Sequence, residues 1–259
     1  MSFTPFAIAP LTPQEQADLY PYEAPPSAYV IEGGACRPFD ESDTEALHQR
    51  HAVLSVGSNR APRQLLRKFG PDRALYVTPA TLHDCDIIHS ACFSYYGAVP
   101  CTAYPSVGTA VSLNAVWLND EELEIMHATE AVGIAYDFGQ WHEGQVVLDS
   151  PISPDGVFGY STRLGALCDE GERPFGLASI AATNRQFTKL TQLEARQQLY
   201  HRLPPALQET DITVFLARLI DDKPFRGEVN DCLLGQASPM QTGPFTIIQA
   251  ETNQADAYL

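Results

Sequence analysis

The spacing of apolar positions changes along the chain and predicts both strands and helices. Residues 52–56 form a short apolar run, which is typical of a buried strand. A helix is predicted over residues 62–69, because a proline opens it and apolar positions recur on one face. Residues 75–106 favour short strands separated by turns, and the apolar–polar alternation over 108–118 indicates a further strand.

Side chains that can cap a helix predict the next element, over residues 120–130. Asn119 can accept a hydrogen bond at the start of this helix, and Glu122 completes a capping box three positions later. Thr191 and Glu194 form a second capping box further along. The remaining expected elements are a strand region over 136–148 and helices over about 191–203 and 211–220.

This mixture of elements predicts an α+β fold in three parts. Residues 1–45 hold seven of the twenty prolines and show weak periodicity, so we expect an N-terminal arm. Residues 46–150 contain the clearest strands and helices and are expected to form the core. Residues 151–259 are expected to form a mostly helical C-terminal extension packed on that core.

Charge and composition limit the classes of binding partner that we expect. The formal net charge of -16 disfavours binding to nucleic acid and to anionic membranes, since both are polyanions. No apolar run reaches the roughly 18 residues of a membrane-spanning segment, and no secretory signal opens the chain, so a cytoplasmic protein is expected. The six cysteines lack C-x-x-C spacing, and no metal or cofactor is expected. The sequence does not indicate an oligomeric state.

The first candidate for chemistry is the turn Gly57-Ser58-Asn59 between the first predicted strand and helix. Backbone N–H groups of such a turn and the positive end of the helix can together bind a carboxylate or phosphate. Gly57 permits close approach to the backbone, and Asn59 can hydrogen-bond a polar group. The same three residues are also ordinary turn formers, so a structural role is the alternative.

The second candidate is Glu130, at the end of the predicted helix 120–130. Helical spacing places it on one face with Leu123, Met126 and His127, and the apolar members make that face the buried one. The other acids of the helix are expected to be solvated; these are Glu121, Glu122 and Glu124. A carboxyl group among apolar side chains suits general acid/base catalysis near neutral pH. Alternatively, Glu130 reaches water where the helix ends.

These motifs together resemble the γ-glutamylcyclotransferase-like family. Residues 56–59, Val-Gly-Ser-Asn, look like its Tyr-Gly-Ser-Asn loop, and residues 80–82 resemble the small residue and leucine that follow. Residues 115–123 resemble its strand entering a helix, and 126–131 resemble its Leu-Asp-x-x-Glu-Gly signature. The resemblance covers roughly residues 50 to 150. Three departures are Val56 for tyrosine, His127 for aspartate and Ala131 for glycine.

The resemblance implies a small mixed β-barrel with flanking helices and a cavity at the loop Val56–Asn59. It implies a cofactor-independent enzyme in which Glu130 is the general acid/base. The α-amine of a γ-glutamyl amine or peptide would attack its own γ-carbonyl, releasing 5-oxoproline and a free amine. Tyr136, which begins the strand region after Glu130, is expected to border the same cavity, with a packed tyrosine as the alternative.

Two other functions remain open on the sequence. The loss of the loop tyrosine at Val56 leaves room for a hydrolase or acyl transferase that acts on a related amide in the same cavity. The long additions at both ends of the chain leave room for a non-catalytic ligand-binding or interaction protein.

Overall fold

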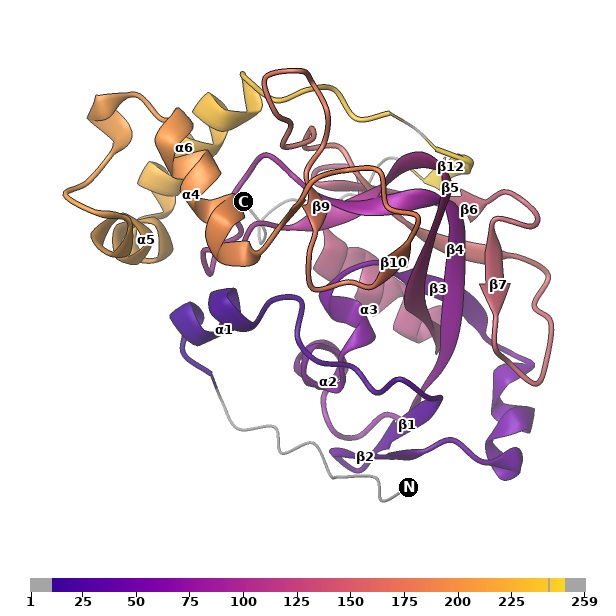
Figure 1. Ribbon diagram of the computed structural model, residues 1–259. Coiled ribbons are helices and arrows are strands. Elements are labelled where there is room, and N and C mark those ends of the chain that lie inside the picture. The colour runs from indigo at the N-terminus through magenta and orange to yellow at the C-terminus, as the bar shows by residue number, and fades with distance from the viewer. Residues whose placement is uncertain (1–10, 242, 250–259) are drawn as a thin grey trace.

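A mixed β-sheet forms the centre of the structure (Figure 1). The computed structural model describes residues 11–241 and 243–249; the two chain ends, which belong to the expected arm and extension, and residue 242 lie outside the described residues. The strands are β1 (Tyr29–Glu32), β2 (Ala35–Pro38), β3 (His51–Ser55), β4 (Leu75–His89), β5 (Cys101–Leu118), β6 (Tyr136–Trp141), β7 (Val146–Leu148), β8 (Val157–Thr162), β9 (Gly176–Leu177), β10 (Ala182–Thr183), β11 (Lys189–Leu190) and β12 (Phe245–Gln249). The helices are α1 (Pro13–Leu19), α2 (Pro62–Phe69), α3 (Asp120–Glu130), α4 (Gln192–Arg202), α5 (Ile212–Asp221) and α6 (Lys223–Leu234), with 3₁₀ turns at Glu41–Leu47, Ser58–Arg60 and Pro205–Leu207.

The α+β class is confirmed, whereas the β-barrel is not. The main path through the sheet runs β11-β9-β4-β5-β3-β8-β6-β12, with β1, β2, β7 and β10 paired beside it. Among the described residues, no ladder joins the two ends of this path, so the sheet stays open. Most neighbouring strands are antiparallel, while β3 runs parallel to β8 and β11 runs parallel to β9.

Two long strands replace the short strands expected over residues 75–106. β4 and β5 pair antiparallel from Tyr76–Trp117 to His89–Cys101, with one irregularity beside Asp84. Polar residues that break the apolar pattern of β4 are buried and bonded across the fold. The hydroxyl of Thr78 accepts from Trp117 Nε1 at 3.0 Å, and buried Asp86 pairs with Arg185. The expectation failed because these partners are distant in sequence.

The predicted helices are confirmed with small shifts of their ends. Asn119 and Glu122 form the capping box of α3, and Thr191 and Glu194 form that of α4. Local hydrogen bonds of this kind depend only on residues three positions apart, and this makes them readable from the sequence.

Strands from all three parts of the chain enter the sheet. β1, from the range assigned to the arm, pairs with β4. β8 lies between β3 and β6, and β12 pairs with β6, although both belong to the range assigned to the extension. The division at residues 45 and 150 stays a prediction.

Helices α4, α5 and α6 lie together beside the sheet (Figure 1) and share a core with the segment that links β4 to β5. Phe93 and Val99 of this segment are buried among leucines and aromatics of the helices. The amide of Asn230 bonds both backbone groups of Phe93, at 2.8 and 3.0 Å. The amide of Gln192 does the same for Val99, at 3.0 and 2.8 Å. The helices therefore fix the path of the β4–β5 link.

Glu122 is not solvated as expected. Its side chain is 3% exposed and pairs with Arg50, which also donates to the backbone oxygen of Trp117. Glu122 also accepts from the backbone N–H of Asn119. Helical spacing assigned Glu122 to the outer face of α3, but the segment before β3 covers that face, and Arg50 supplies the countercharge.

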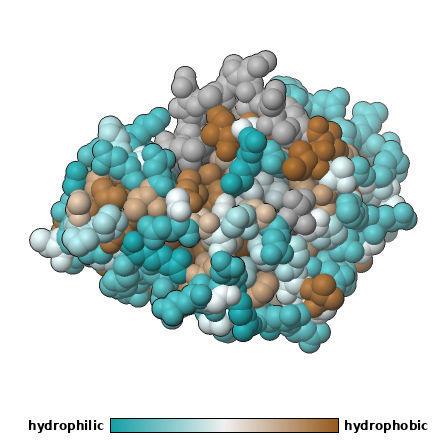
Figure 2. Space-filling model, turned by 90° about the horizontal axis from the view of Figure 1, so that it is seen from above, coloured by the Kyte–Doolittle hydropathy of each residue, from teal (hydrophilic) through white to brown (hydrophobic). Residues whose placement is uncertain are grey.

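The longest helix in the described part of the chain, α6, has 12 residues, fewer than the roughly 20 that cross a bilayer. Figure 2 shows a face on which hydrophobic patches are separated by hydrophilic side chains.

We expect Glu122→Gln to lower the free energy of unfolding by about 1.5–3 kcal/mol, because the mostly buried guanidinium of Arg50 loses its charged partner while the cap is kept. Urea denaturation measures the change. Glu124→Gln, which alters an exposed carboxylate on the same helix, serves as the control and should stay within about 0.5 kcal/mol. Equal effects of the two substitutions would contradict the structural role of the pair.

His89 should make the fold sensitive to acid. It is buried on β4, its Nε2 lies 3.0 Å from the backbone oxygen of Leu190, and burial lowers its pKa from 6.5 to about 4. Between these values the unfolded chain binds a proton that the folded chain excludes, so stability falls as pH drops from 6.5 towards 4, by about 3 kcal/mol in total.

The variant His89→Gln keeps a donor for Leu190 but does not titrate. Urea denaturation of both proteins at several pH values should show a smaller loss of stability for the variant in this window. Parallel losses would show that His89 is not responsible.

Candidate functional site

The expected strand, turn and helix around Gly57–Asn59 are present. β3 ends at Ser55, a 3₁₀ turn covers Ser58–Arg60, and α2 begins at Pro62. The groups that lie close to Gly57 are side chains of the protein itself, those of Tyr20 and Cys101. A Cβ atom there would lie 2.8 Å from the Tyr20 hydroxyl and 3.0 Å from Cys101 Sγ. A contact of 2.8 Å is too short for a Cβ atom, so any other residue at this position would displace the Tyr20 side chain.

Glu130 is the last residue of α3, and its side chain is 13% exposed. One carboxylate oxygen, Oε1, accepts a hydrogen bond from Asn59 Nδ2 at 2.9 Å and another from the ammonium group of Lys68. The end of α3 thus meets both the turn and α2. The candidate acid/base is mostly buried and touches the turn as expected, but its carboxylate is paired with a cation, whereas the sequence suggested apolar neighbours alone.

Lys68 is a site residue that the sequence reasoning missed. Its side chain is 2% exposed, and burial lowers its pKa, an effect that the charge of Glu130 partly offsets. A signal was present, because Lys68 lies three positions after fully buried Leu65 and so falls near the apolar face of α2. A lysine near a buried face requires a partner, but its identity depends on α3, 62 residues away.

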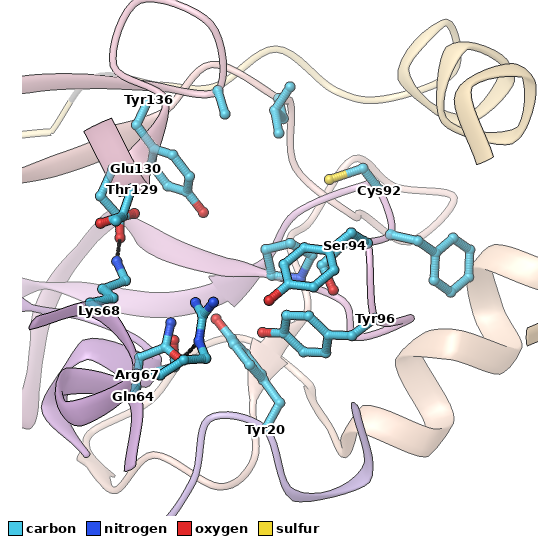
Figure 3. A pocket seen from close by; sticks show the side chains of 16 residues that line it. Tyr20, Gln64, Arg67, Lys68, Cys92, Ser94, Tyr96, Thr129, Glu130 and Tyr136 are labelled. Carbon is cyan, nitrogen blue, oxygen red and sulfur yellow. Dashed lines mark hydrogen bonds and ion pairs between the residues drawn. The ribbon is translucent and has the colours of Figure 1, made fainter. Parts of the chain in front are cut away.

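Tyr136, the first residue of β6, lines the pocket together with Glu130. Its hydroxyl points into the pocket (Figure 3) and makes no hydrogen bond with any described residue. Burial, together with the nearby charge of Glu130, raises the pKa of Tyr136 well above its usual value. The phenol therefore stays protonated at neutral pH and can act as a hydrogen-bond donor.

The pocket consists of two neighbouring compartments, whose walls share Glu130 and Tyr136. The smaller compartment, of about 390 Å³ including the open space at its mouth, is lined by Val56 and the rest of the turn. The larger compartment, of about 660 Å³ including its mouth, lies between α2 and the β4–β5 link. Tyr20 and Ser58 also border both compartments. The structure thus brings the predicted residues together; these are Val56, Gly57, Ser58, Asn59, Glu130 and Tyr136.

Two further parts of the pocket wall come from segments to which the sequence assigned no chemistry. Residues 92–96, in the β4–β5 link, form one wall; α6 holds Phe93 of this segment, and α4 holds Val99 further along the link. Tyr20, from the expected arm, forms another. Its hydroxyl lies 3.2 Å from both Sγ and the backbone N of Cys101. Arg196 of α4 bonds Asp18, anchoring α1, the helix that precedes Tyr20.

The thiols at the pocket are poor candidates for nucleophiles. Cys92 borders the larger compartment and Cys101 the smaller one. Burial raises the pKa of each thiol to about 12, so neither is a thiolate at neutral pH.

His127, on the same face of α3 as Glu130, bonds the hydroxyl of Tyr160 at 2.8 Å and packs against Phe138, as a structural histidine does.

No group of three or more potential metal ligands occurs among the described residues. The polar chemistry of the pocket is therefore a carboxylate with a countercharge, an amide and several hydroxyls. This set can move a proton and stabilise a polarised carbonyl.

Comparisons of the chain with models of protein families, with curated proteins and with solved structures return no match.

Proposed function

We propose that the chain is a γ-glutamylcyclotransferase-like enzyme that converts a γ-glutamyl amine or peptide into 5-oxoproline and a free amine. The observation that carries the proposal is the position of Glu130, a mostly buried carboxylate held by Asn59 and Lys68 in the wall that the two compartments share. The turn and α3 carry separate sequence motifs, and the hydrogen bond between Asn59 of the turn and Glu130 of α3 joins these motifs across 71 positions of the chain.

In the proposed reaction, the α-amine of the substrate attacks its own γ-carbonyl and closes a five-membered ring. Glu130 takes the proton that the attacking nitrogen loses and delivers it to the leaving nitrogen as the amide C–N bond breaks. The reaction requires no metal or redox cofactor, because ring closure is intramolecular and the nucleophile is held beside its target.

Lys68 favours the second half of this proton transfer, in which Glu130 gives up the proton. Its ammonium group is the countercharge of the Glu130 carboxylate before the reaction. Once Glu130 takes a proton, the buried Lys68 loses that partner, and a buried unpaired charge is unfavourable. The pair therefore favours rapid return of the proton to the leaving nitrogen.

Two neutral groups complete the proposed site. The Tyr136 hydroxyl can donate to the γ-carbonyl oxygen as negative charge develops on it. Asn59 Oδ1 is buried without a hydrogen-bond partner among the described residues, so it can accept from the substrate α-amine. Asn59 thereby links the substrate nucleophile to Glu130, which its Nδ2 contacts.

The test of function is mass analysis of the products released from a set of γ-glutamyl amines. We expect 5-oxoproline and the free amine. Release of glutamate would instead identify a hydrolase with the same pocket, and tight binding without product would identify a ligand-binding protein.

We expect Glu130→Gln to lower turnover by at least roughly 10²–10⁴-fold, because glutamine cannot accept the proton. The variant should fold and bind substrate, since glutamine nearly matches glutamate in size. It should also be less stable, because Lys68 loses its countercharge. Glu124→Gln, on the exposed face of α3, is the matched control and should retain activity. A folded Glu130→Gln protein with near-normal turnover would refute the acid/base role.

Tyr136→Phe should lower kcat/KM by roughly 10²-fold, as the loss of one donor to a developing oxyanion does elsewhere. The fold should persist, because the hydroxyl bonds no described residue. Tyr104→Phe is the control: it also removes a tyrosine hydroxyl, but at a residue outside the pocket, and it should leave kcat/KM unchanged. Identical kinetics of Tyr136→Phe and wild type would make Tyr136 a packing residue only.

A further inference from the structure

The two compartments differ in size and chemistry. When the substrate amide is cleaved beside Glu130, the γ-glutamyl group lies in one compartment and the leaving group lies in the other. The smaller compartment has the turn and Asn59 Oδ1, which suit the polar head of a glutamyl group. The larger compartment therefore receives the leaving group, and its walls indicate what that group is.

Several aromatic rings line the larger compartment. They are the side chains of Tyr20, Tyr95, Tyr96 and Tyr136, whereas the ring of Phe93, which also borders the compartment, packs against Phe215 in the core of the helices. Tyr95 and Tyr96 meet edge to face, with ring centroids 4.9 Å apart. Aromatic side chains favour a further ring in offset or edge-to-face contact, by about 0.5–1.5 kcal/mol beyond the area they bury.

A guanidinium lies at the mouth of the same compartment. Arg67, exposed on α2, directs its terminal nitrogens into the pocket (Figure 3), and its Nε donates to Gln64 Oε1 at 3.1 Å. None of the ion pairs found among the described residues involves Arg67. Its two terminal nitrogens can bind a carboxylate in the bidentate manner that guanidinium groups favour.

Cationic leaving groups fit this compartment poorly. Arg67 and Lys68 both line it, and the one carboxylate among its lining residues, Glu130, is already paired with Lys68. A diamine or a lysine side chain would bring a third positive charge to this place. The walls thus combine affinity for an aromatic ring with affinity for an anion.

We propose that the leaving group is an aromatic α-amino acid, whose ring packs among the tyrosines and whose carboxylate binds Arg67. This inference rests on the proposed cyclotransferase function and names its substrate class. The amide bond between the γ-carbonyl and the nitrogen of the aromatic amino acid breaks. The α-nitrogen of the glutamyl group forms the ring bond to the γ-carbonyl carbon, and the products are 5-oxoproline and the aromatic amino acid. The proton passes through Glu130, so atoms and charge balance.

The test compares four substrates with the full-length protein. They are γ-glutamyl-phenylalanine, γ-glutamyl-leucine, γ-glutamyl-phenethylamine, which lacks the carboxylate, and γ-glutamyl-lysine joined through the lysine side-chain amine. We expect kcat/KM for 5-oxoproline release to be about tenfold or more higher for the phenylalanine substrate than for each of the others.

Arg67→Gln should reduce the preference for γ-glutamyl-phenylalanine over γ-glutamyl-phenethylamine by about tenfold, which is the effect of one charge-assisted hydrogen bond. Arg73→Gln makes the same charge change outside the pocket, at a residue paired with Glu121, and should leave that preference unchanged. An unchanged preference in Arg67→Gln would overturn the role of Arg67.

Binding to Glu130→Gln, measured by calorimetry, separates this inference from the proposed reaction. Release of 5-oxoproline from all four substrates at similar rates would overturn the inference and leave the cyclotransferase function standing. Preferred binding of γ-glutamyl-phenylalanine with no 5-oxoproline from wild type would overturn the reaction but support the pocket's selectivity. Neither turnover nor preferred binding would overturn the inference.

Discussion

The antiparallel ladder between β4 and β5 is the constraint on which the rest of the structure depends. β1, β7 and β9 pair with β4, while β3 and β10 pair with β5, so strands that precede and strands that follow this pair in the sequence attach to it. β3 leads directly into the turn Gly57–Asn59, and β5 leads directly into α3. The register of β3 on β5 therefore sets where the turn lies relative to Glu130, and any shift of that register would separate them.

The pair of Lys68 and Glu130 joins two helices that follow neighbouring strands. α2 follows β3 and α3 follows β5, and each contributes one charge. A buried pair of this kind is costly to desolvate and is strongly destabilised when one partner is removed. Such a pair is therefore a weak source of stability but a strong constraint on position, and position is what a proton-transferring carboxylate requires.

Segments outside residues 46–150 support the wall of the pocket and add Tyr20 and Leu164 to it. α4 and α6 hold the β4–β5 link through the amides of Gln192 and Asn230, and this link supplies one pocket wall. α1 is held to α4 by Arg196, and the chain then delivers Tyr20 onto Gly57. Apart from Tyr20 and Leu164, the residues that line the larger compartment lie between Ser58 and Tyr136, so the region that bears the motifs also forms most of this compartment.

The sequence by itself determined the elements whose causes are local. The capping box at Asn119, the proline that opens α2 and the helical spacing that places Glu130 on the face of Met126 act over a few residues, and each was predicted. Only the tertiary structure decided that β4 continues through Asp86, that Glu122 is buried, and that Lys68 and Tyr20 reach the pocket. Each of these depends on a partner tens of residues away, because a buried charge or hydroxyl is tolerated only when folding brings its partner to it.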